Sequence, residues 1–190
     1  MVNGTVKVQK SIYNITENLA KADEDCSEYT SVQGYTINDT NTASFLAVRK
    51  NDSEMAALAY ITNLNSIPKV NPGRRLWHAN DCAFYKGNYF IAMGSNNNDD
   101  DLITDIKCFD KSLERIATYS YVPMSGETQL NYISCIAYLT GDYFVVGAGL
   151  VYSICRINET AKTFNAVSQF TIDNKKITPY LTRGRLQKNH

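Results

Sequence analysis

The chain has 190 residues, of which 44% are hydrophobic, and it is long and apolar enough to bury a core, which excludes an intrinsically disordered protein. Lys plus Arg and Asp plus Glu both total 19, so the formal net charge is zero, which argues against a protein that grips nucleic acid through a basic surface. No run approaches the roughly 18 apolar residues that cross a bilayer, and residues 1–10 lack the apolar stretch of a secretory signal. We therefore expect no nucleic-acid partner and no membrane span.

The N-terminal part of the chain is predicted to hold one strand and one irregular segment. Residues 6–15 alternate between apolar and polar side chains, which is typical of a strand. Residues 18–27 are polar and acidic and indicate a loop or a short helical turn. We expect the N-terminal strand to complete a sheet begun elsewhere, because pairing removes exposed strand edges.

Three copies of one strand pattern follow. Each copy opens with a strand, a polar turn and a second strand that is almost continuously apolar, as expected where a strand is covered on both faces. Gly-Asn and Gly-Asp pairs in the second and third turns supply the positive φ angles that tight hairpins need. The paired strands are 33–37 with 44–48, 81–85 with 89–94, and 134–138 with 143–147.

Each copy continues with a third strand, polar turn residues and a fourth strand. The later fourth strands alternate, as half-exposed strands do, whereas Pro68 restricts the first of them to a sheet edge. The predicted third strands are 57–61, 104–109 and 152–157, and the fourth strands are 67–70, 115–122 and 164–172.

The spacing of the copies matches the blades of a β-propeller. Phe45 and Phe90 are 45 residues apart and Phe90 and Phe144 are 54 apart, whereas a four-stranded blade takes about 40–50 residues. The longer spacing carries an insert at 95–101. One such sheet cannot bury both of its faces alone, so neighbouring copies must stack. A β-sandwich built from the same strands is the alternative, but it would not explain so regular a repeat.

We therefore predict an all-β fold, namely a β-propeller or partial propeller built from about three four-stranded antiparallel blades plus terminal strands. A single domain spans 1–182, and a frayed tail follows at 183–190. Three copies are few for a closed ring, which leaves three alternatives. The chain ends form a thin fourth blade, another chain completes the ring, or the chain is part of a longer propeller, and the first two are preferred. The blade-like repeats are 32–72, 78–125 and 131–173, and a further strand is expected at 177–181.

Two segments resemble the starts of blades in β-propeller proteins of Gram-positive bacteria and their phages. They are Val32–Ile37 (VQGYTI) and Trp77–Phe84 (WHANDCAF), in which a Gln-Gly or His-Ala-Asn-Asp element opens the innermost strand. The resemblance covers roughly residues 32–172 and is specific for the architecture rather than the function. It implies a receptor-binding platform, a lectin-like surface module, or a lyase or hydrolase scaffold.

The polar cluster before the second innermost strand is the strongest candidate for a ligand site. Trp77 offers a stacking face, and His78, Asn80 and Asp81 offer hydrogen-bonding groups. Propellers bind ligands where their innermost strands begin and end. The structural interpretation is that Asn80 and Asp81 cap a turn while His78 bonds a neighbouring backbone group.

Arg74 and Arg75 are a second candidate, because a pair of guanidinium groups suits an anionic ligand such as phosphate. They follow a Pro-Gly pair, so the alternative is a solvated turn. Residues 96–101 are rich in oxygen ligands but lack the spacing of a calcium loop, and a solvated insert is expected there. Core and blade packing explains most of the thirteen tyrosines, Tyr138 among them, whereas Tyr119 and Tyr121 lie on an outer strand and could be exposed.

The cysteines follow no Cys-x-x-Cys spacing and only two histidines accompany them, so we predict no metal site and no cofactor. Four of the five lie within apolar strand patterns and are expected to be buried free thiols rather than a disulfide framework. This usage suits a protein that folds in a reducing compartment. The five are Cys26, Cys82, Cys108, Cys135 and Cys155.

The leading functional hypothesis is a non-enzymatic binding or assembly module that presents loops to a glycan or a protein partner. It would act as a homo-oligomer or in a larger assembly, such as a phage tail or a bacterial surface structure. Free thiols and the missing secretory signal suit folding in the cytoplasm and release by lysis with a virion. One alternative is a hydrolase or lyase on a propeller scaffold that uses His78 and Asp81, with no catalytic residue assigned by spacing. The other is a purely structural oligomer subunit.

Overall fold

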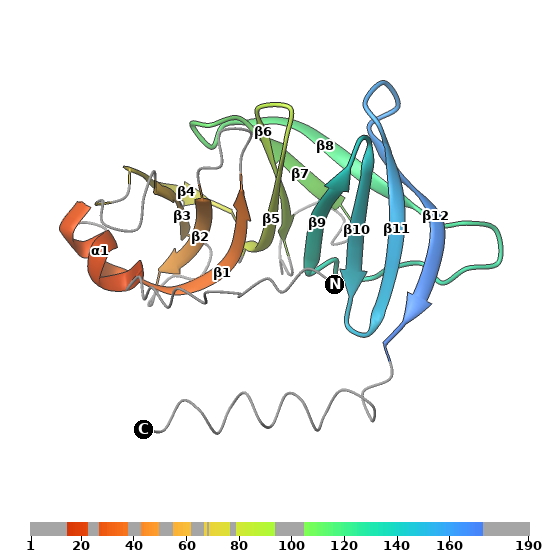
Figure 1. Ribbon diagram of the computed structural model, residues 1–190, viewed down its shortest axis with the longest axis horizontal. Helices are drawn as coiled ribbons and strands as arrows, with labels where there is room; N and C mark the ends of the chain where they lie inside the picture. The colour runs from red at the N-terminus through yellow and green to blue at the C-terminus, as the bar shows by residue number, and fades with distance from the viewer. Residues whose placement is uncertain are drawn as a thin grey trace, which may run out of the picture.

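The computed structural model describes residues 15–22, 27–37, 43–49, 55–61, 67, 69–76, 79–93 and 105–172, and these residues form one α-helix and twelve strands (Figure 1). In chain order they are α1 (Ile15–Ala22), β1 (Tyr29–Ile37), β2 (Ala43–Arg49), β3 (Met55–Ile61), β4 (Lys69–Arg75), β5 (Ala79–Tyr85), β6 (Asn88–Met93), β7 (Asp105–Phe109), β8 (Arg115–Val122), β9 (Cys135–Thr140), β10 (Tyr143–Ala148), β11 (Val151–Asn158) and β12 (Thr163–Thr171).

The strands form three antiparallel groups of four, which we call the first blade (β1–β4), the second blade (β5–β8) and the third blade (β9–β12). Within each blade the strands pair in chain order. The three blades lie side by side along the molecule, with the first strand of each facing a common axis (Figure 1). This confirms the all-β fold and the partial propeller of three blades that the repeat predicted.

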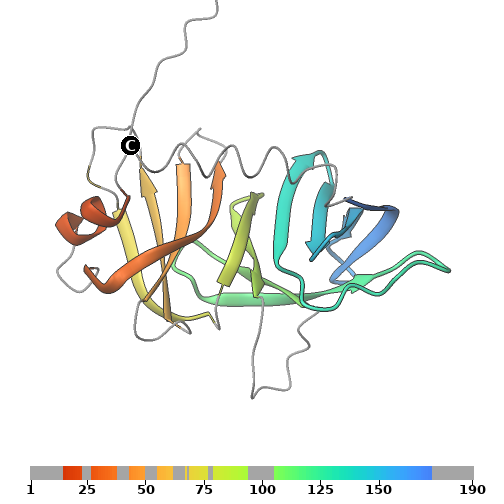
Figure 2. The ribbon, with the colours of Figure 1, turned by 90° about the horizontal axis from the view of Figure 1, so that it is seen from below.

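The second and third blades are also joined at their outer edges. Strand β12 pairs in parallel with β8, with Phe164 opposite Tyr121, so the two blades form one eight-stranded sheet. The same sheet folds back on itself, because its two terminal strands, β5 and β9, pack against each other. Figure 2 shows the first blade beside this nearly closed sheet, and no strand pairing among the described residues joins the two. The repeat did not predict the join, since it depends on residues in two different copies.

The hairpin turns follow the glycine chemistry predicted for them. Lys86 and Gly87 have φ angles of 48° and 84°, as a type I′ turn between β5 and β6 requires. Gly141 has a φ angle of 61° at the first central position of the turn between β9 and β10, which suits a type II′ turn. These two turns hold the matching hairpins of the second and third blades in register.

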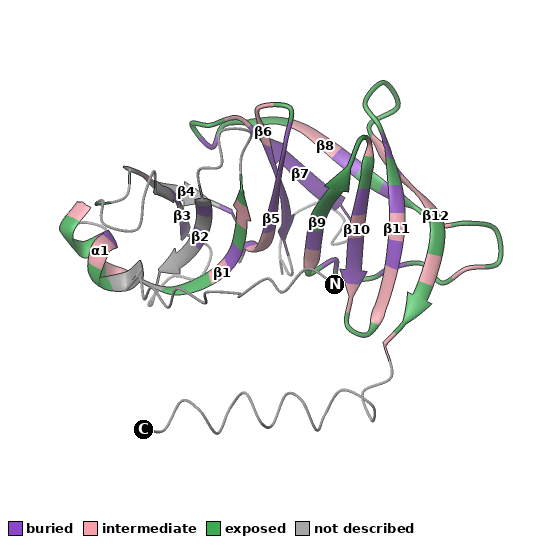
Figure 3. Cartoon of the chain, in the orientation of Figure 1, coloured by how far each residue is buried: buried purple, intermediate pink, exposed green. Residues whose placement is uncertain are grey.

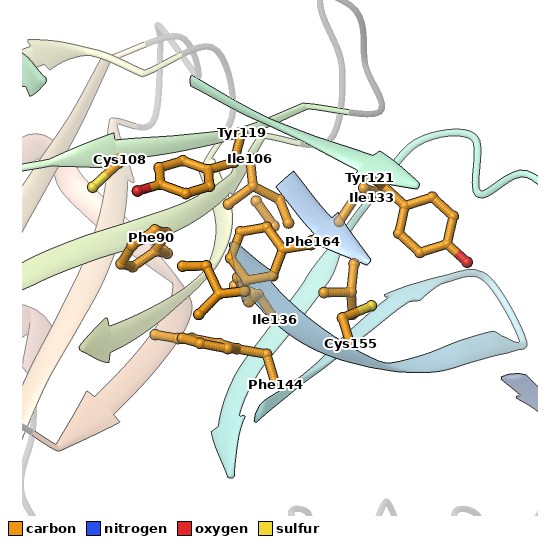
Figure 4. Packing of buried hydrophobic residues seen from close by; sticks show 14 of the residues in the cluster. Phe90, Ile106, Cys108, Tyr119, Tyr121, Ile133, Ile136, Phe144, Cys155 and Phe164 are labelled. Carbon is orange, nitrogen blue, oxygen red and sulfur yellow. The ribbon is translucent and has the colours of Figure 1, made fainter. Parts of the chain in front are cut away.

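Two hydrophobic clusters fill the spaces between the blades. The larger lies between the second and third blades, and its centre is a group of rings formed by Phe90, Tyr119, Phe144 and Phe164 (Figure 4). The smaller lies between the first and second blades and includes Leu46. The second blade is therefore covered on both faces, and its strands β6 and β7 are almost wholly buried (Figure 3). This is the stacking that the apolar repeat required.

Two sequence predictions are wrong. Arg74 and Arg75 do not form a turn but end strand β4, whose Pro72 and Gly73 fall at a register shift on the sheet edge, where a missing backbone donor is tolerated. Tyr119 and Tyr121 are 4% and 5% exposed, not solvated, because their side chains pack in the hydrophobic cluster between the second and third blades.

The described cysteines are free thiols, as predicted. Cys82, Cys108 and Cys155 are buried and Cys135 is half-buried, whereas Cys26 lies outside the described residues. Burial raises the pKa of the Cys155 thiol to about 12 and that of Cys108 to about 11, so both side chains pack as small apolar groups.

Several predictions lie partly or wholly outside the described residues. These include the N-terminal strand up to residue 14, the insert 95–101, the strand at 177–181 and the tail, so the limits of the predicted domain remain predictions. Helix α1 begins at Ile15 and covers part of the stretch expected to be a loop or helical turn. No helix among the described residues is long and apolar enough to cross a membrane.

Candidate functional site

The first strands of the three blades meet at one place, where β5 packs against both β1 and β9. Gly34 in β1 is what allows the approach to β5. A Cβ atom at this position would lie 2.7 Å from the Asp81 Cα and 2.8 Å from the Cys82 backbone nitrogen, far inside van der Waals contact. The Gln-Gly element of the first blade therefore has a packing role that composition alone did not show.

Asp81 closes the seam between the two terminal strands of the eight-stranded sheet. Its Oδ2 accepts a hydrogen bond of 3.1 Å from the Ile136 backbone N–H in β9, and its Oδ1 accepts one of 2.9 Å from the Cys82 N–H. No strand pairing joins β5 to β9, so this carboxylate supplies a partner for an edge donor that would otherwise stay unpaired. Asp81 lies inside β5 and not in a turn. Its carboxylate therefore links two blades, whereas the structural interpretation of the sequence expected it to cap a turn.

Thr36 makes the corresponding link between the first and second blades. Its Oγ1 accepts a hydrogen bond of 3.0 Å from the Phe84 backbone N–H, so β1 and β5 are also joined by a side chain. Deeper in the same interface, the Ser44 and Tyr89 hydroxyls lie 3.0 Å apart and form a buried hydrogen bond. The three inner strands are therefore held by side chains rather than by a continuous sheet.

These strands enclose a hollow of about 330 Å³, which we call the axial hollow. Its volume is at the lower end of the range for small-molecule sites, which is roughly 300–1,000 Å³. Tyr35, Ile37 and Tyr138 stand at its rim with 60%, 51% and 42% of their surface exposed, and the Asp81 carboxylate lies in its wall. The lining residues are Tyr35, Thr36, Ile37, Asp81, Cys82, Ile136, Ala137 and Tyr138.

Burial raises the pKa of the Asp81 carboxyl above its ordinary value of 3.8. This effect outweighs four donors that lower the pKa, which come from the backbones of Ile136, Cys82 and Tyr35 and from the Cys135 thiol. The folded protein thus holds the Asp81 proton more tightly than the unfolded chain, and the stability contributed by this group is lost as the pH rises through its folded pKa.

We therefore expect the free energy of unfolding of the wild type, minus that of Asp81→Asn, to fall as the pH rises from the ordinary pKa of 3.8 through the raised pKa of the folded protein. The variant removes the titrating proton at this position, so other titrating groups cancel in the difference. Urea unfolding of both proteins at several pH values measures it. If the difference in the free energy of unfolding between the two proteins increased with pH over this interval, hydrogen bonding and not burial would dominate the pKa of Asp81.

The structure places the described residues of the two candidate ligand sites on different strands. Asp81 lines the axial hollow, and Asn80 is half-buried beside it in β5. Arg74 and Arg75 lie on β4, three strands away from β1 in the first blade, a displacement of roughly 14 Å at the usual strand spacing. Trp77 and His78 lie outside the described residues. Among the described residues of these two candidates, only Asp81 lines the axial hollow.

Sequence analysis missed the rim of the hollow. Tyr138 was expected in the core, and its ring does contact those of Tyr85 and Phe144, at 5.4 Å in both cases, yet 42% of its surface is exposed. Tyr35 and Tyr138 occupy the first strands of different blades, so a search of these strands for exposed aromatic residues would have found both.

A second hollow of about 480 Å³ lies beside the hairpin turns of the second and third blades. Its charged groups are paired with each other. Lys86 Nζ lies 2.5 Å from Glu159 Oε1, and Arg156 Nε lies 2.6 Å from Asp142 Oδ2. Both pairs are substantially exposed, so they contribute little stability. Because each charge already has its counter-ion, this hollow is the weaker candidate for a ligand site.

No family model and no curated protein matches the chain. Three solved structures illustrate what it is similar to. The Hsv2 protein of Kluyveromyces lactis, with loop 6CD replaced by a Gly-Ser linker, is 9% identical over 75% of this chain and 40% of that one, at a TM-score of 0.45. A chain of the mitotic checkpoint complex is 6% identical over 75% and 37%, at 0.45. A functionally unknown protein from Desulfotomaculum acetoxidans is 12% identical over 75% and 57%, at 0.39.

The matched region spans less than two thirds of each of these three chains. At sequence identities this low, neither the activity nor the partners of these proteins can be assigned to this chain. The partial-propeller architecture follows instead from the strand order, the register and the packing of the blades described above.

Proposed function

We propose that this protein is a non-enzymatic binding module that holds a glycan at the axial hollow, as a component of a phage tail or a bacterial surface. One observation carries the proposal: the first strands of all three blades meet around a hollow rimmed by exposed tyrosines, with a carboxylate in its wall. Tyrosine rings provide flat apolar surface with a polar tip, and a carboxylate accepts hydrogen bonds from hydroxyl groups. A sugar ring offers both an apolar face and hydroxyl donors.

Replacing Tyr35 by alanine is expected to weaken glycan binding at least about tenfold, which corresponds to roughly 1.4 kcal/mol. The side chain is 60% exposed, so its removal costs little packing while taking away one wall of the hollow. A glycan array with the full chain identifies the ligand, and calorimetry on wild type and variant measures the change. Tyr143→Ala is the matched control, since this tyrosine is 37% exposed and does not line the hollow.

Equal loss of affinity in both variants would remove the axial hollow from the binding site. Wild-type protein that binds no glycan would overturn the glycan proposal itself. The alternative of a hydrolase or lyase using His78 and Asp81 predicts turnover of a glycoside or ester panel that is lost in His78→Ala. Asp81 already accepts two backbone hydrogen bonds, which favours a positioning role over proton transfer.

A protein partner is the second candidate, and it is favoured by apolar side chains near the same axis. Ile37 and Leu139 are 51% and 47% exposed, which is more apolar surface than a sugar site needs. This candidate predicts that Leu139→Asp abolishes capture of a protein partner while glycan binding persists, because Leu139 does not line the axial hollow. Pull-down with phage or bacterial surface proteins, followed by this variant, separates it from the glycan proposal.

The proposal includes self-assembly through the third blade. Leu150, Val167 and Phe170 are 39%, 45% and 43% exposed on this blade, and the Phe170 ring stacks on Tyr152 at 5.7 Å. We expect a second copy of the chain to cover this apolar surface. Sedimentation velocity should show an oligomer that Phe170→Asp converts to monomer. A wild-type protein that stays monomeric at roughly tens of micromolar, where weak homodimers form, would contradict self-assembly.

A further inference from the structure

The axial hollow has one carboxyl group and no Lys, Arg or His among its lining residues. That carboxyl group belongs to Asp81, and the other lining residues are Tyr, Thr, Cys, Ile and Ala side chains. Among the described residues, the groups that contact the Asp81 carboxylate are backbone N–H donors and a thiol, with no Lys or Arg side chain. The carboxylate is half-buried, so its charge is less screened than that of a surface acid.

The rim of the hollow suits a cation as well as a sugar. Tyr35 on β1 and Tyr138 on β9 flank the hollow from different blades, and the faces of aromatic rings attract ammonium groups. The second hollow offers a contrast within the same molecule, because each of its carboxylates already has a basic partner. Of the carboxylates that line the two hollows, Asp81 is therefore the one that has no basic partner among the described residues and can pair with a cationic ligand.

We propose that the axial hollow selects a protonated primary amine, carried by an amino sugar of the glycan. This inference rests on the proposed function and narrows it to a ligand class. Asp81 supplies the opposite charge, Tyr35 and Tyr138 supply the walls, and the amine donates to the Asp81 carboxylate, which also accepts from the Cys82 and Ile136 amides.

A matched pair of small probes tests the amine independently of any glycan. The full chain, labelled with ¹⁵N, is titrated with n-butylammonium and with n-butanol, which differ mainly in charge. We expect n-butylammonium to shift the backbone amide signals of Cys82, Phe84 and Ile136, with an affinity at least about tenfold higher than that of n-butanol. Equal responses to the two probes, or none to n-butylammonium, would overturn the inference.

Charge-removing variants assign the effect to one residue. Asp81→Asn is expected to abolish the preference for n-butylammonium, whereas Asp142→Asn, which removes a carboxylate already paired with Arg156, should leave it unchanged. Should Asp81→Asn unfold, raising the sodium chloride concentration with wild-type protein provides the second measurement. Screening should weaken n-butylammonium binding and leave that of n-butanol unaffected, and salt-independent binding would contradict the role of Asp81.

The same spectra distinguish this inference from the proposed function. A glucosamine oligomer and its N-acetylated form are titrated next. Tighter binding of the free amine form supports both claims. Binding of n-butylammonium without either oligomer would overturn the glycan proposal and keep the amine site, whereas preference for the acetylated oligomer with no response to n-butylammonium would overturn the amine site and keep the glycan proposal.

Discussion

Phe144→Ala should lower the free energy of unfolding by about 3–5 kcal/mol, which is the usual cost of emptying a buried phenylalanine site. Phe144 is 0% exposed, and its ring lies 5.1 to 5.8 Å from those of Phe164, Tyr85 and Phe90 in the cluster between the second and third blades (Figure 4). Four surrounding strands fix the walls of the cavity, so little collapse can offset the loss. Thermal unfolding should show a midpoint lower by roughly 6–20 °C.

Phe170→Ala is the control for this prediction. Phe170 is on the same blade but is 43% exposed, and it stacks only on Tyr152 among the ring contacts of the described residues. Its loss should cost less than about 1 kcal/mol. Similar losses for the two variants would mean that the blades do not share the core described here.

Gly34→Ala should destabilise the protein by about 1–3 kcal/mol, although alanine usually stabilises a strand relative to glycine. The added methyl group would lie 2.7 to 2.9 Å from backbone atoms of Asp81 and Cys82, which cannot move aside as a flexible side chain would. Strand β1 would have to withdraw from β5. The Thr36 link to the Phe84 amide would lengthen, so ligand affinity at the axial hollow should fall as well.

Urea unfolding of Gly34→Ala, beside Gln33→Ala on the same strand, measures the effect. The Gln33 side chain donates to the Ser31 hydroxyl at 2.7 Å in an exposed pair, and its loss should stay within about 0.5 kcal/mol. The sign is the decisive point, because an unchanged or increased stability of Gly34→Ala would show that β1 does not approach β5 at Asp81.

The strand pattern could be predicted from the sequence because its causes are local. Apolar runs and turn glycines recur with each copy, so strand β8 was predicted with the bounds that the structure shows, and the other strands of the second and third blades lie within two residues of their predicted ends. The stacking of blades was also predictable, since the second strand of each copy is apolar on both faces. The exceptions lie in the first blade. Strand β1 begins at Tyr29, four residues before the predicted start at residue 33, and in β4 Pro72 and Gly73 indicated a turn but lie at a sheet-edge register shift.

The site could not be predicted in the same way, because its parts come from three blades. Asp81 was singled out as a polar residue near an inner strand, but its partner Ile136 is 55 residues away and gives no signal in the sequence. Tyr119 and Tyr121 looked like the exposed positions of an outer strand until β12 paired beside them. The amino-acid sequence by itself determined the strands, their turns and the need for neighbouring blades. Only the tertiary structure decided which carboxylate meets which amide and which tyrosines stay in water, because those outcomes depend on distances between strands that local patterns do not encode.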